Sequence, residues 1–546
     1  MSKASLSEFL IAEAAKPKNI AIAIAAFISY KIIYQVFLWP YFLSPLRNVP
    51  GPPPGNPLVG QFLEIIREEP AAPQTRWADK YGPVVRTVGP IGLERMMFTK
   101  PEALHRILVA DWLDNPRPGF MRNILGLVAG YGLLTVTGNE HKQMRKAMNP
   151  AFSIPNLSAQ VESYYETIDG LVEILKDKIN GEANPSAGKQ LQMYEWMSKA
   201  TLDIICETAF GYKTDSIHNP HNELAEAYED LINLQSAYNL VKMLPLMLTP
   251  GVPRFMASEW GYRHRHWFAA IPMFAPAATL MRSMYTIKKI SAQMLKEKLE
   301  DSAHIAADDT AAKRDIMSLL VRARMADKGE GYQMSDGAMM DQVLTFLGAG
   351  HETTASGLAW TLWLLAKSPE AQDKLRAEVA PILADEPHPS YRTLKDMQWL
   401  DCVVMESLRL MPPVPMTLRI ANKDQWIDGL LIPKGTIHYI PIKVVNTWKV
   451  LWGEDANEFK PERWLNLPKD YNSTFSVLSF IAGPHHCIGK TMSIIEMKAV
   501  VASIIAHFSF EPAYEGQVAK PTAAVTMKPA DGMPLRVKIV QPKQTA

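Results

Sequence analysis

The chain has little cysteine and no excess of charge of either sign. It contains 546 residues but only three cysteines, Cys206, Cys402 and Cys487, which lie far apart. An odd number of widely spaced cysteines argues against a disulfide framework and predicts free thiols in a reducing compartment. The 57 lysines and arginines nearly balance the 56 aspartates and glutamates. Without a strong basic field, the composition argues against nucleic acid as a partner.

Long apolar runs are also missing, with one exception near the N-terminus. The segment from Ile20 to Leu43, IAIAIAAFISYKIIYQVFLWPYFL, is nearly unbroken apolar sequence. As a helix rising about 1.5 Å per residue, it is long enough to cross a bilayer. Lys31 in its middle costs about 2.5–3.5 kcal/mol on insertion unless its side chain reaches the interface. A cleavable signal peptide fits less well, since the run begins late, is too long and lacks a small-residue cleavage site.

We therefore predict that residues 1–47 form an N-terminal segment with a transmembrane anchor at about 20–43. Residues 48–57, NVPGPPPGNP, follow it as a proline-rich hinge. Prolines bias such a segment toward extended conformations, which predicts a short stiff spacer that orients the rest of the chain against the membrane. An ordinary proline-rich linker fits the composition equally well.

Residues 58–546 lack internal repeats and a second hydrophobic span, so we predict a single domain. Most of the sequence between 101 and 410 has the periodicity of long helices. Short strands are predicted in PVVRTVG at 83–89, ERMMFTK at 94–100, WIDGLLIPKGTIHYIP at 426–441 and LRVKIV at 535–540. Many helices with a small segregated sheet make an α+β class, mainly α.

One cysteine lies in an unusual loop, FIAGPHHCIG, from Phe480 to Gly489. A zinc site fits poorly, because zinc needs four convergent ligands and the side chains of three consecutive residues diverge. A catalytic thiol could use a histidine partner, but the sequence offers no recognisable oxyanion hole. A thiolate ligand for haem iron uses every residue of the loop, because an apolar helix begins at Cys487 and its free N–H groups would stabilise the thiolate.

In this interpretation Gly483 permits a tight turn, Gly489 lets the backbone approach a macrocycle, and Phe480 shields the ligand loop. The pattern Phe-x-x-Gly-x-x-x-Cys-x-Gly, at Phe480, Gly483, Cys487 and Gly489, resembles the haem-thiolate signature of the cytochrome P450 monooxygenases. The resemblance implies haem b with Cys487 as the axial ligand of its iron. It also implies that Ile488 lies against the haem.

A second motif, GAGHETT from Gly348 to Thr354, lies in a helix predicted from about 335 to 368. Each glycine costs about 1 kcal/mol in a helix interior relative to alanine, so Gly348 and Gly350 need a compensating contact. Close approach to a flat ligand would supply one. Helix packing, with the threonines bonded back to the preceding turn, is the alternative. The family resemblance implies a dioxygen groove with Ala349 and Gly350 against the haem, and with Glu352 and Thr353 as catalytic residues that deliver protons and hydrogen-bond dioxygen.

The motif ESLR places Glu406 and Arg409 three residues apart on one helix face, where an ion pair can form. Apolar neighbours suggest that the pair is buried, and a buried arginine needs its carboxylate. The resemblance adds Arg463 of FKPERW as a third member, with a structural role.

Resemblance also assigns Arg145 and Arg419 to the haem propionates. Two residues depart from the family pattern: His141 stands where tryptophan is usual, and His485 where arginine is usual. Both can still donate hydrogen bonds to propionates, but their charge depends on pH.

The activity that this resemblance implies is monooxygenation of a lipophilic molecule, such as a terpenoid, polyketide, fatty acid or sterol. No flavin or nicotinamide fingerprint is evident, so electrons from NADPH would arrive through a separate NADPH-cytochrome P450 reductase, with cytochrome b5 as a second partner. Basic residues near the cysteine could form its docking face: Lys142, Arg145, Lys146 and Lys490. Apolar stretches could line the substrate pocket: 120–134, 240–253 including Met243, Leu244, Leu246, Met247 and Leu248, and also Phe346 and Val414.

The sequence resembles the fungal microsomal members of this family, which implies a role in secondary metabolism. They also imply a single-pass anchor in the endoplasmic reticulum membrane, with the catalytic domain facing the cytosol. Two alternatives stay open: a reductase-independent haem-thiolate isomerase or dehydratase, and a non-enzymatic membrane haem sensor. Neither accounts for an acid and a hydroxyl placed together at Glu352 and Thr353.

Overall fold

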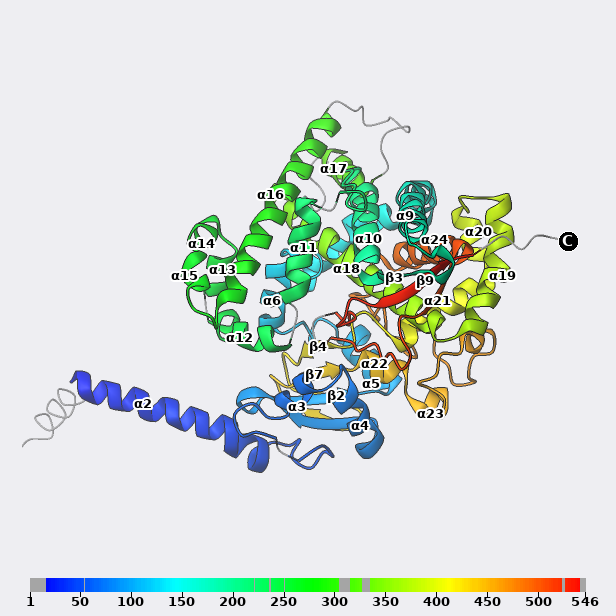
Figure 1. The fold of residues 1–546 in the computed structure, drawn as a ribbon. Helices are drawn as coiled ribbons and strands as arrows, with labels where there is room; N and C mark the ends of the chain where they lie inside the picture. Colours follow the sequence, from blue (N-terminus) through cyan, green and yellow to red (C-terminus); the bar gives the residue numbers. More distant parts are fainter. Residues whose placement is uncertain are drawn as a thin grey trace, which may run out of the picture.

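The computed structural model describes residues 16–53, 55–219, 221–234, 237–249, 251–303, 315–326, 334–522 and 526–540. Figure 1 shows a helical body with small sheets and one long helix, α2, that projects away from it. The architecture is α+β and mainly α, as predicted.

The body is built around α18 (Asp336–Ala366), the longest helix in the described part of the chain. The Ser335 hydroxyl accepts a hydrogen bond from the backbone N–H of Ala338 at 3.2 Å, which caps the first turn. Pro369 begins the next helix and cannot continue this one. Residues 336–366 agree with the predicted helix at about 335–368, and most of them are buried.

Other long helices pack around α18 and bury their apolar faces against it and one another (Figure 1). They are α9 (Glu162–Asn180), α10 (Met193–Phe210), α11 (Glu223–Leu234), α16 (Ala275–Ala303), α17 (Ile316–Ala326), α19 (Pro369–Asp385), α21 (Gln398–Leu410) and α24 (Lys490–His507). Shorter helices complete the body: α3 (Phe62–Arg67), α4 (Ala72–Tyr81), α5 (Pro101–His105), η3 (Arg106–Ala110), α6 (Gly119–Ala129), α7 (Gly138–Met148), η4 (Asn149–Phe152), α8 (Ile154–Gln160), η5 (Pro185–Ala187), α12 (Ala237–Leu248), α13 (Val252–Met256), α14 (Glu259–Arg263), α15 (His266–Ala269), α20 (Tyr391–Asp396), α22 (Ile442–Asn446), α23 (Lys449–Trp452) and η6 (Pro461–Leu465).

The strands form small sheets at the edge of the helical body, and every segment predicted to contain a strand does contain one, whereas β3, β4 and β8 were not predicted. The largest has the order β1-β2-β7-β4, with β1 (Val84–Val88) antiparallel to β2 (Glu94–Phe98) and β2 parallel to β7 (Ile437–Ile440). In it, β4 (Thr417–Ile420) pairs antiparallel with β7, which sets Arg419 opposite His438. The other sheets are β3-β9-β8 (Lys189–Gln192, Pro534–Ile539 and Phe508–Pro512) and β5-β6 (Gln425–Ile427 and Leu430–Ile432).

The apolar N-terminal run forms a continuous helix, as predicted. It consists of α2 (Pro17–Ile33) and the π-helical η1 (Tyr34–Leu43), together 27 residues, and an 18-residue stretch within it has a mean hydropathy of 1.8. No residue of α2 is buried, whereas η1 buries Val36 and Pro40. By length and composition this is the one helix in the described part of the chain that could cross a membrane.

The C-terminal end of this apolar helix is hydrogen-bonded to the β1–β2 hairpin. Glu94 accepts hydrogen bonds from the indole N–H of Trp39 at 2.9 Å and the hydroxyl of Ser44 at 2.8 Å. Its other oxygen accepts from Arg86 Nε at 2.8 Å, and Arg86 also donates to the carbonyl of Pro40. At Gly92, between the strands, a Cβ atom would lie 2.1 Å from the Gln35 carbonyl oxygen, so only glycine allows this contact.

The proline-rich segment, in which Pro54 lies outside the described residues, runs along β1. The Pro50 carbonyl accepts from the Arg86 N–H at 2.9 Å. A Cβ atom on Gly51 would lie 1.9 Å from the Arg86 carbonyl oxygen. These contacts place the segment close against the body, while its action as a hinge stays a prediction.

Two truncations are expected to distinguish the exposed part of the N-terminal helix from the part that is bonded to the body. Deleting residues 1–33 should leave the thermal unfolding of the detergent-solubilised protein unchanged, because α2 has no buried residue. Deleting residues 1–43 should cost about 2 kcal/mol, because Glu94 and Arg86 lose partners while remaining largely buried. Equal melting temperatures for the two truncated proteins would contradict this docking.

Candidate active site

The Phe480–Gly489 loop lies immediately before α24 and folds back on itself. The backbone N–H of Cys487 donates to the Phe480 carbonyl, and that of His486 to the Gly483 carbonyl, both at 2.9 Å. Gly483 has φ of +76°, and a Cβ atom there would lie 2.0 Å from the Leu108 carbonyl oxygen in η3. The turn therefore requires glycine for both its dihedral angle and its close contact.

Cys487 differs from the other two cysteines in its surroundings. Its side chain is exposed, whereas Cys206 and Cys402 are buried. Protein atoms still surround the sulfur closely enough that burial raises its pKa, while a hydrogen bond from the Gly489 N–H and the charges of Arg145 and Lys490 lower it. A reachable sulfur with an N–H donor and two nearby cations suits a thiolate that binds a metal.

The rest of the loop leaves the sulfur free on one side. Gly489 is the N-cap of α24, and a Cβ atom built on it meets nothing within 4 Å. Phe480 and Ile488 are partly buried and pack against separate core clusters on either side of the loop. Lys490 Nζ lies 5.7 Å from the centroid of the Phe480 ring. The neighbouring histidines point elsewhere, because His486 bonds to Gly483 and Arg145.

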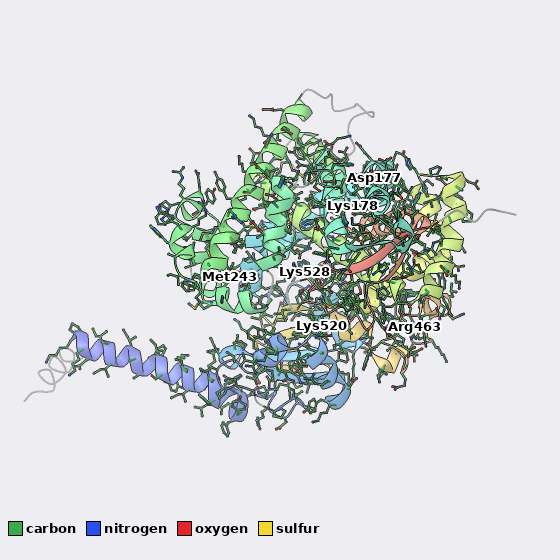
Figure 2. The ribbon with its side chains drawn as sticks, viewed as in Figure 1. Asp177, Lys178, Met243, Arg463, Lys520 and Lys528 are labelled. Atoms are coloured by element: carbon green, nitrogen blue, oxygen red, sulfur yellow. The ribbon has the colours of Figure 1, made fainter. Side chains whose placement is uncertain are left out.

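A buried ion pair stabilises the Phe480–Gly489 loop. Glu406 and Arg409 of α21 are fully buried and make two parallel hydrogen bonds of 2.8 Å. Arg463, labelled in Figure 2, lies with Nε 3.4 Å from Glu406 Oε1 but bonds more closely to Asp455, at 2.9 Å. Trp464 donates its indole N–H to Glu406 at 3.0 Å. The three predicted residues therefore do meet.

Asn446 joins this ion pair to the start of the cysteine loop. Arg409 donates to the Asn446 carbonyl at 3.1 Å, and the Asn446 amide donates to the Arg409 carbonyl at 3.1 Å and to Ser479 Oγ at 2.8 Å. Its amide oxygen accepts from the Leu478 N–H at 2.7 Å. Leu478 and Ser479 directly precede Phe480, so the buried pair fixes the entry to the loop.

A cluster of basic side chains lies beside the loop, and we call Arg117, Arg419, His141 and His485 the cation cluster. Arg419 is buried and donates to the Leu418 carbonyl at 2.8 Å and to Thr417 Oγ1 at 3.1 Å, but its Nη2 has no partner. Arg117 donates to the Leu134 carbonyl. The His141 and His485 rings lie 3.8 Å apart, and His141 Nδ1 has no partner.

Within the described part of the chain, no carboxylate is found to act on the cation cluster. Burial lowers the pKa of Arg117 to about 10 and, together with the charge of Arg117, holds the pKa of Arg419 well below its usual value. Burial, followed by the charges of nearby arginines, lowers the pKa of His141 to about 4 and that of His485 to about 2. None of the charges that shift these four groups is a carboxylate.

Buried cations with no acidic partner fit a ligand that carries carboxylates. Three of the four residues predicted to bind propionates belong to this cluster, namely Arg419, His141 and His485. The fourth predicted residue, Arg145, donates instead to the His486 carbonyl and lies 2.8 Å from His486 Nε2, beside the cysteine. Sequence reasoning missed Arg117, because NPRPGF has neither helical periodicity nor a motif that marks the arginine.

The middle of α18 presents a short partly exposed surface inside the body. From 342 to 366 the helix is buried, apart from Leu364 and a group in the GAGHETT motif: Gly348, Ala349, Gly350, Glu352 and Thr353. Thr353 donates its hydroxyl to the Ala349 carbonyl at 2.7 Å, which places the two residues on one face. A flat ligand could lie against this face.

Helix packing supplies its own reason for one of the glycines. A Cβ atom on Gly350 would lie 2.7 Å from Cγ1 of Ile205 in α10, closer than packed side chains allow. On Gly348 it would lie 3.5 Å from Cβ of Ala129 in α6, which is ordinary contact. Thr354 bonds back to the Gly350 carbonyl at 3.0 Å. The packing interpretation thus explains Gly350, and contact with haem stays a prediction.

Glu352 faces residues that sequence reasoning did not identify. Its Oε1 accepts a hydrogen bond from the hydroxyl of Thr526. Its charge also acts on Lys528, whose pKa burial lowers to about 8, and on the buried Tyr194 and Tyr228, whose pKa values are raised well above the usual value, mainly by burial. Thr526 and Lys528 are 174 and more residues away in sequence, so no local spacing could have revealed them.

Many of the predicted pocket residues lie in one apolar cluster, but not all of them. Met243 of α12, labelled in Figure 2, and Met247 are buried, and Leu246 is partly buried, in the same cluster as Phe346 and α6. The side chains of Leu244 and Leu248 lie outside the described residues. Val414 packs partly buried in a different cluster with residues of η3 and β5.

The comparisons with known proteins agree with this geometry. The family model described as Cytochrome P450 matches residues 50–535. Cytochrome P450 monooxygenase 205 of Postia placenta is 34% identical over 514 residues, covering 90% of this chain and 90% of that protein. Cytochrome P450 monooxygenase sphH of Aspergillus fumigatus is 29% identical over 92% of this chain and 90% of its own length. A ganoderic acid synthetase of Ganoderma lucidum is 28% identical over 90% of this chain and 92% of its own length.

Proposed function

This chain belongs to the cytochrome P450 family of haem-thiolate monooxygenases, and we propose that it inserts one atom of dioxygen into a lipophilic small molecule, using electrons that a separate reductase takes from NADPH. The observation that carries the proposal is the exposed sulfur of Cys487 at the N-terminus of α24, beside the cation cluster.

The residues around Cys487 fit haem b. Cys487 would ligate the iron, the open side of Gly489 would face the macrocycle, and Arg117 and Arg419 would bind the propionates, with His141 and His485 as neutral hydrogen-bond donors. When bound, thiolate-ligated haem supplies the chemistry of splitting dioxygen. The chain supplies the thiolate, stabilised by the Gly489 N–H and the charges of Arg145 and Lys490.

The GAGHETT face of α18 would exclude water and hold protons for the reaction. The surroundings of Thr353 are largely apolar, and its hydroxyl is held at 2.7 Å from the Ala349 carbonyl. We assign to Thr353 the holding of a proton at Oγ1, and to Glu352 its resupply, since the two residues are adjacent and both partly exposed.

A terpenoid or polyketide of fungal secondary metabolism is the substrate class we propose, because the relatives are fungal and the pocket elements are apolar. The anchor helix supports a place in the endoplasmic reticulum membrane with the body facing the cytosol. Exposed Lys142, Lys146 and Lys490 lie on α7 and α24 near the cysteine, where NADPH-cytochrome P450 reductase or cytochrome b5 could dock.

Replacing Thr353 with alanine is expected to separate NADPH consumption from product formation. A positioned proton donor contributes about 10²–10⁴-fold, so product per NADPH should fall by at least about tenfold while hydrogen peroxide rises. The measurement uses the membrane protein with a reductase, NADPH and the best substrate from a panel of terpenoids, polyketides, sterols and fatty acids.

Thr354→Ala is the matched control, because this neighbouring hydroxyl is buried and bonds to the Gly350 carbonyl. This variant should form as much product per NADPH as the unaltered protein does. Full coupling in Thr353→Ala would remove the role assigned to Thr353. Product formed without NADPH would instead favour a reductase-independent isomerase or dehydratase.

A further inference from the structure

A segment near the C-terminus, Thr526–Lys528, is hydrogen-bonded to the helix face that carries Glu352. The Met527 carbonyl accepts from Ser356 Oγ at 2.8 Å and from the indole N–H of Trp360 at 2.6 Å. Ser356 and Trp360 follow Glu352 by one and two helical turns on the same face. On its other side, the Met527 N–H donates to the Pro413 carbonyl at 2.7 Å. The segment is therefore fixed between α18 and the chain that follows α21.

The residues on either side of Met527 both act on Glu352. Thr526 donates its hydroxyl to Glu352 Oε1. Lys528, which is buried, donates to the Ile232 carbonyl of α11 at 2.7 Å and lies 6.0 Å from the Tyr194 ring centroid. The charges of Glu352 and Glu229 act on the Lys528 ammonium. Glu229 is exposed on α11 and Glu352 is partly exposed on α18, so an acid from each of these two helices acts on Lys528.

We propose that Thr526 and Lys528 are positioning residues for Glu352: Thr526 fixes the orientation of its carboxylate, and Lys528 keeps a positive charge beside it. This inference rests on the proposed function, in which Glu352 resupplies protons to Thr353. Without the Thr526 hydroxyl the carboxylate loses one of the hydrogen bonds that orient it, and without the Lys528 charge its ionised form is less stable.

The pH dependence follows from the groups that face Lys528. These are Glu352 on α18, Glu229 on α11 and the ring of Tyr194 on α10, while Tyr228 on α11 is affected by the charge of Glu352. Burial raises the pKa of both tyrosines well above the usual value, so they stay neutral, whereas the pKa of Lys528 is about 8. The positive charge is present below about pH 8 and is lost above it. Coupling of NADPH use to product formation should therefore fall as pH rises through this value.

Five variants test the proposal in the full-length holoenzyme: Thr526→Val, Thr526→Ser, Lys528→Met, Lys528→Arg and Lys520→Met. Lys520, labelled with Lys528 in Figure 2, is an exposed lysine that precedes this segment in the chain and serves as the matched control. One readout is the hydrogen peroxide released per NADPH oxidised, measured with a reductase across the pH range. The other is the infrared carbonyl band of the protonated Glu352 carboxyl, assigned with Glu352→Gln, which needs neither reductase nor substrate.

Thr526→Val and Lys528→Met should each release about fivefold more peroxide per NADPH, the ratio that corresponds to one hydrogen bond. Both should retain the protonated carboxyl band to higher pH than the unaltered protein. Thr526→Ser and Lys520→Met should behave as the unaltered protein does. Lys528→Arg should couple normally and lose the decline near pH 8, because arginine stays charged.

The inference is overturned if Thr526→Val and Lys528→Met match the unaltered protein in the infrared titration, or if Thr526→Ser is as impaired as Thr526→Val. Lack of NADPH oxidation by the unaltered protein would count against the proposed function alone, because the infrared titration would still decide the positioning of Glu352. The melting temperature of each variant shows whether a change in coupling arises from misfolding. If Lys528→Met does not fold, Thr526→Val and Lys528→Arg still test the proposal.

Discussion

Replacing Cys487 with alanine is expected to abolish the strongly red-shifted Soret band of the reduced carbon monoxide complex, together with all monooxygenase activity. Cys487 is the exposed sulfur at the N-terminus of α24, where the Gly489 N–H and two cationic side chains stabilise a thiolate. Alanine keeps the loop, because the Cys487–Phe480 contact is made by backbone atoms. The measurement is the difference spectrum of dithionite-reduced membranes with and without carbon monoxide.

Cys402→Ala is the matched control for this experiment. Cys402 is buried in a hydrophobic core cluster, so its sulfur is not accessible to a ligand as that of Cys487 is. Its variant should keep the band. A red-shifted band that survives in Cys487→Ala would show that another residue ligates the iron. Folded, unaltered protein without any haem band would restore the zinc and bare-thiol interpretations of the loop.

The second large effect concerns stability. Arg409→Leu is expected to lower the free energy of unfolding by about 3–5 kcal/mol, because it leaves the buried Glu406 carboxylate without its two 2.8 Å hydrogen bonds. Arg463 cannot replace it, since its Nε lies 3.4 Å from Glu406 and its closer partner is Asp455. Denaturant unfolding of the solubilised protein gives the difference.

Loss of Arg409 should also release haem, because the link through Asn446 holds the residues that precede Phe480. Glu454→Ala is a control that removes an exposed ion pair with Lys449, and it should leave the free energy of unfolding nearly unchanged. If Arg409→Leu does not fold, Arg409→Lys tests the same point, since lysine lacks the second hydrogen bond. Stability and haem content equal to the control would refute the role of this pair.

Sequence reasoning succeeded where a motif is local. The turn at Gly483 and the pair Glu406–Arg409 depend on spacings of a few residues, which the chain itself displays. Short alternating runs likewise predicted strands β1, β2, β7 and β9. In each case the physical cause, a backbone angle or a helical repeat, acts between near neighbours in sequence.

Contacts between distant segments could not be predicted in this way. Arg117 joins Arg419 only after β4 has folded against the chain before α6, and Thr526 reaches Glu352 across 174 residues. The packing of Gly350 against Ile205 shows the same limit. From its own sequence, a glycine that admits a ligand is indistinguishable from one that admits a neighbouring helix.

The bonding of η1 to the β1–β2 hairpin through Glu94 makes the anchor and the body one mechanical unit at that end. A spanning helix adjusts its tilt to the hydrocarbon thickness around it, because mismatch exposes apolar surface to water. In this protein a change in the tilt of the N-terminal helix would also rotate the body. Bilayer thickness would thereby select which surface of the body faces the lipid headgroups.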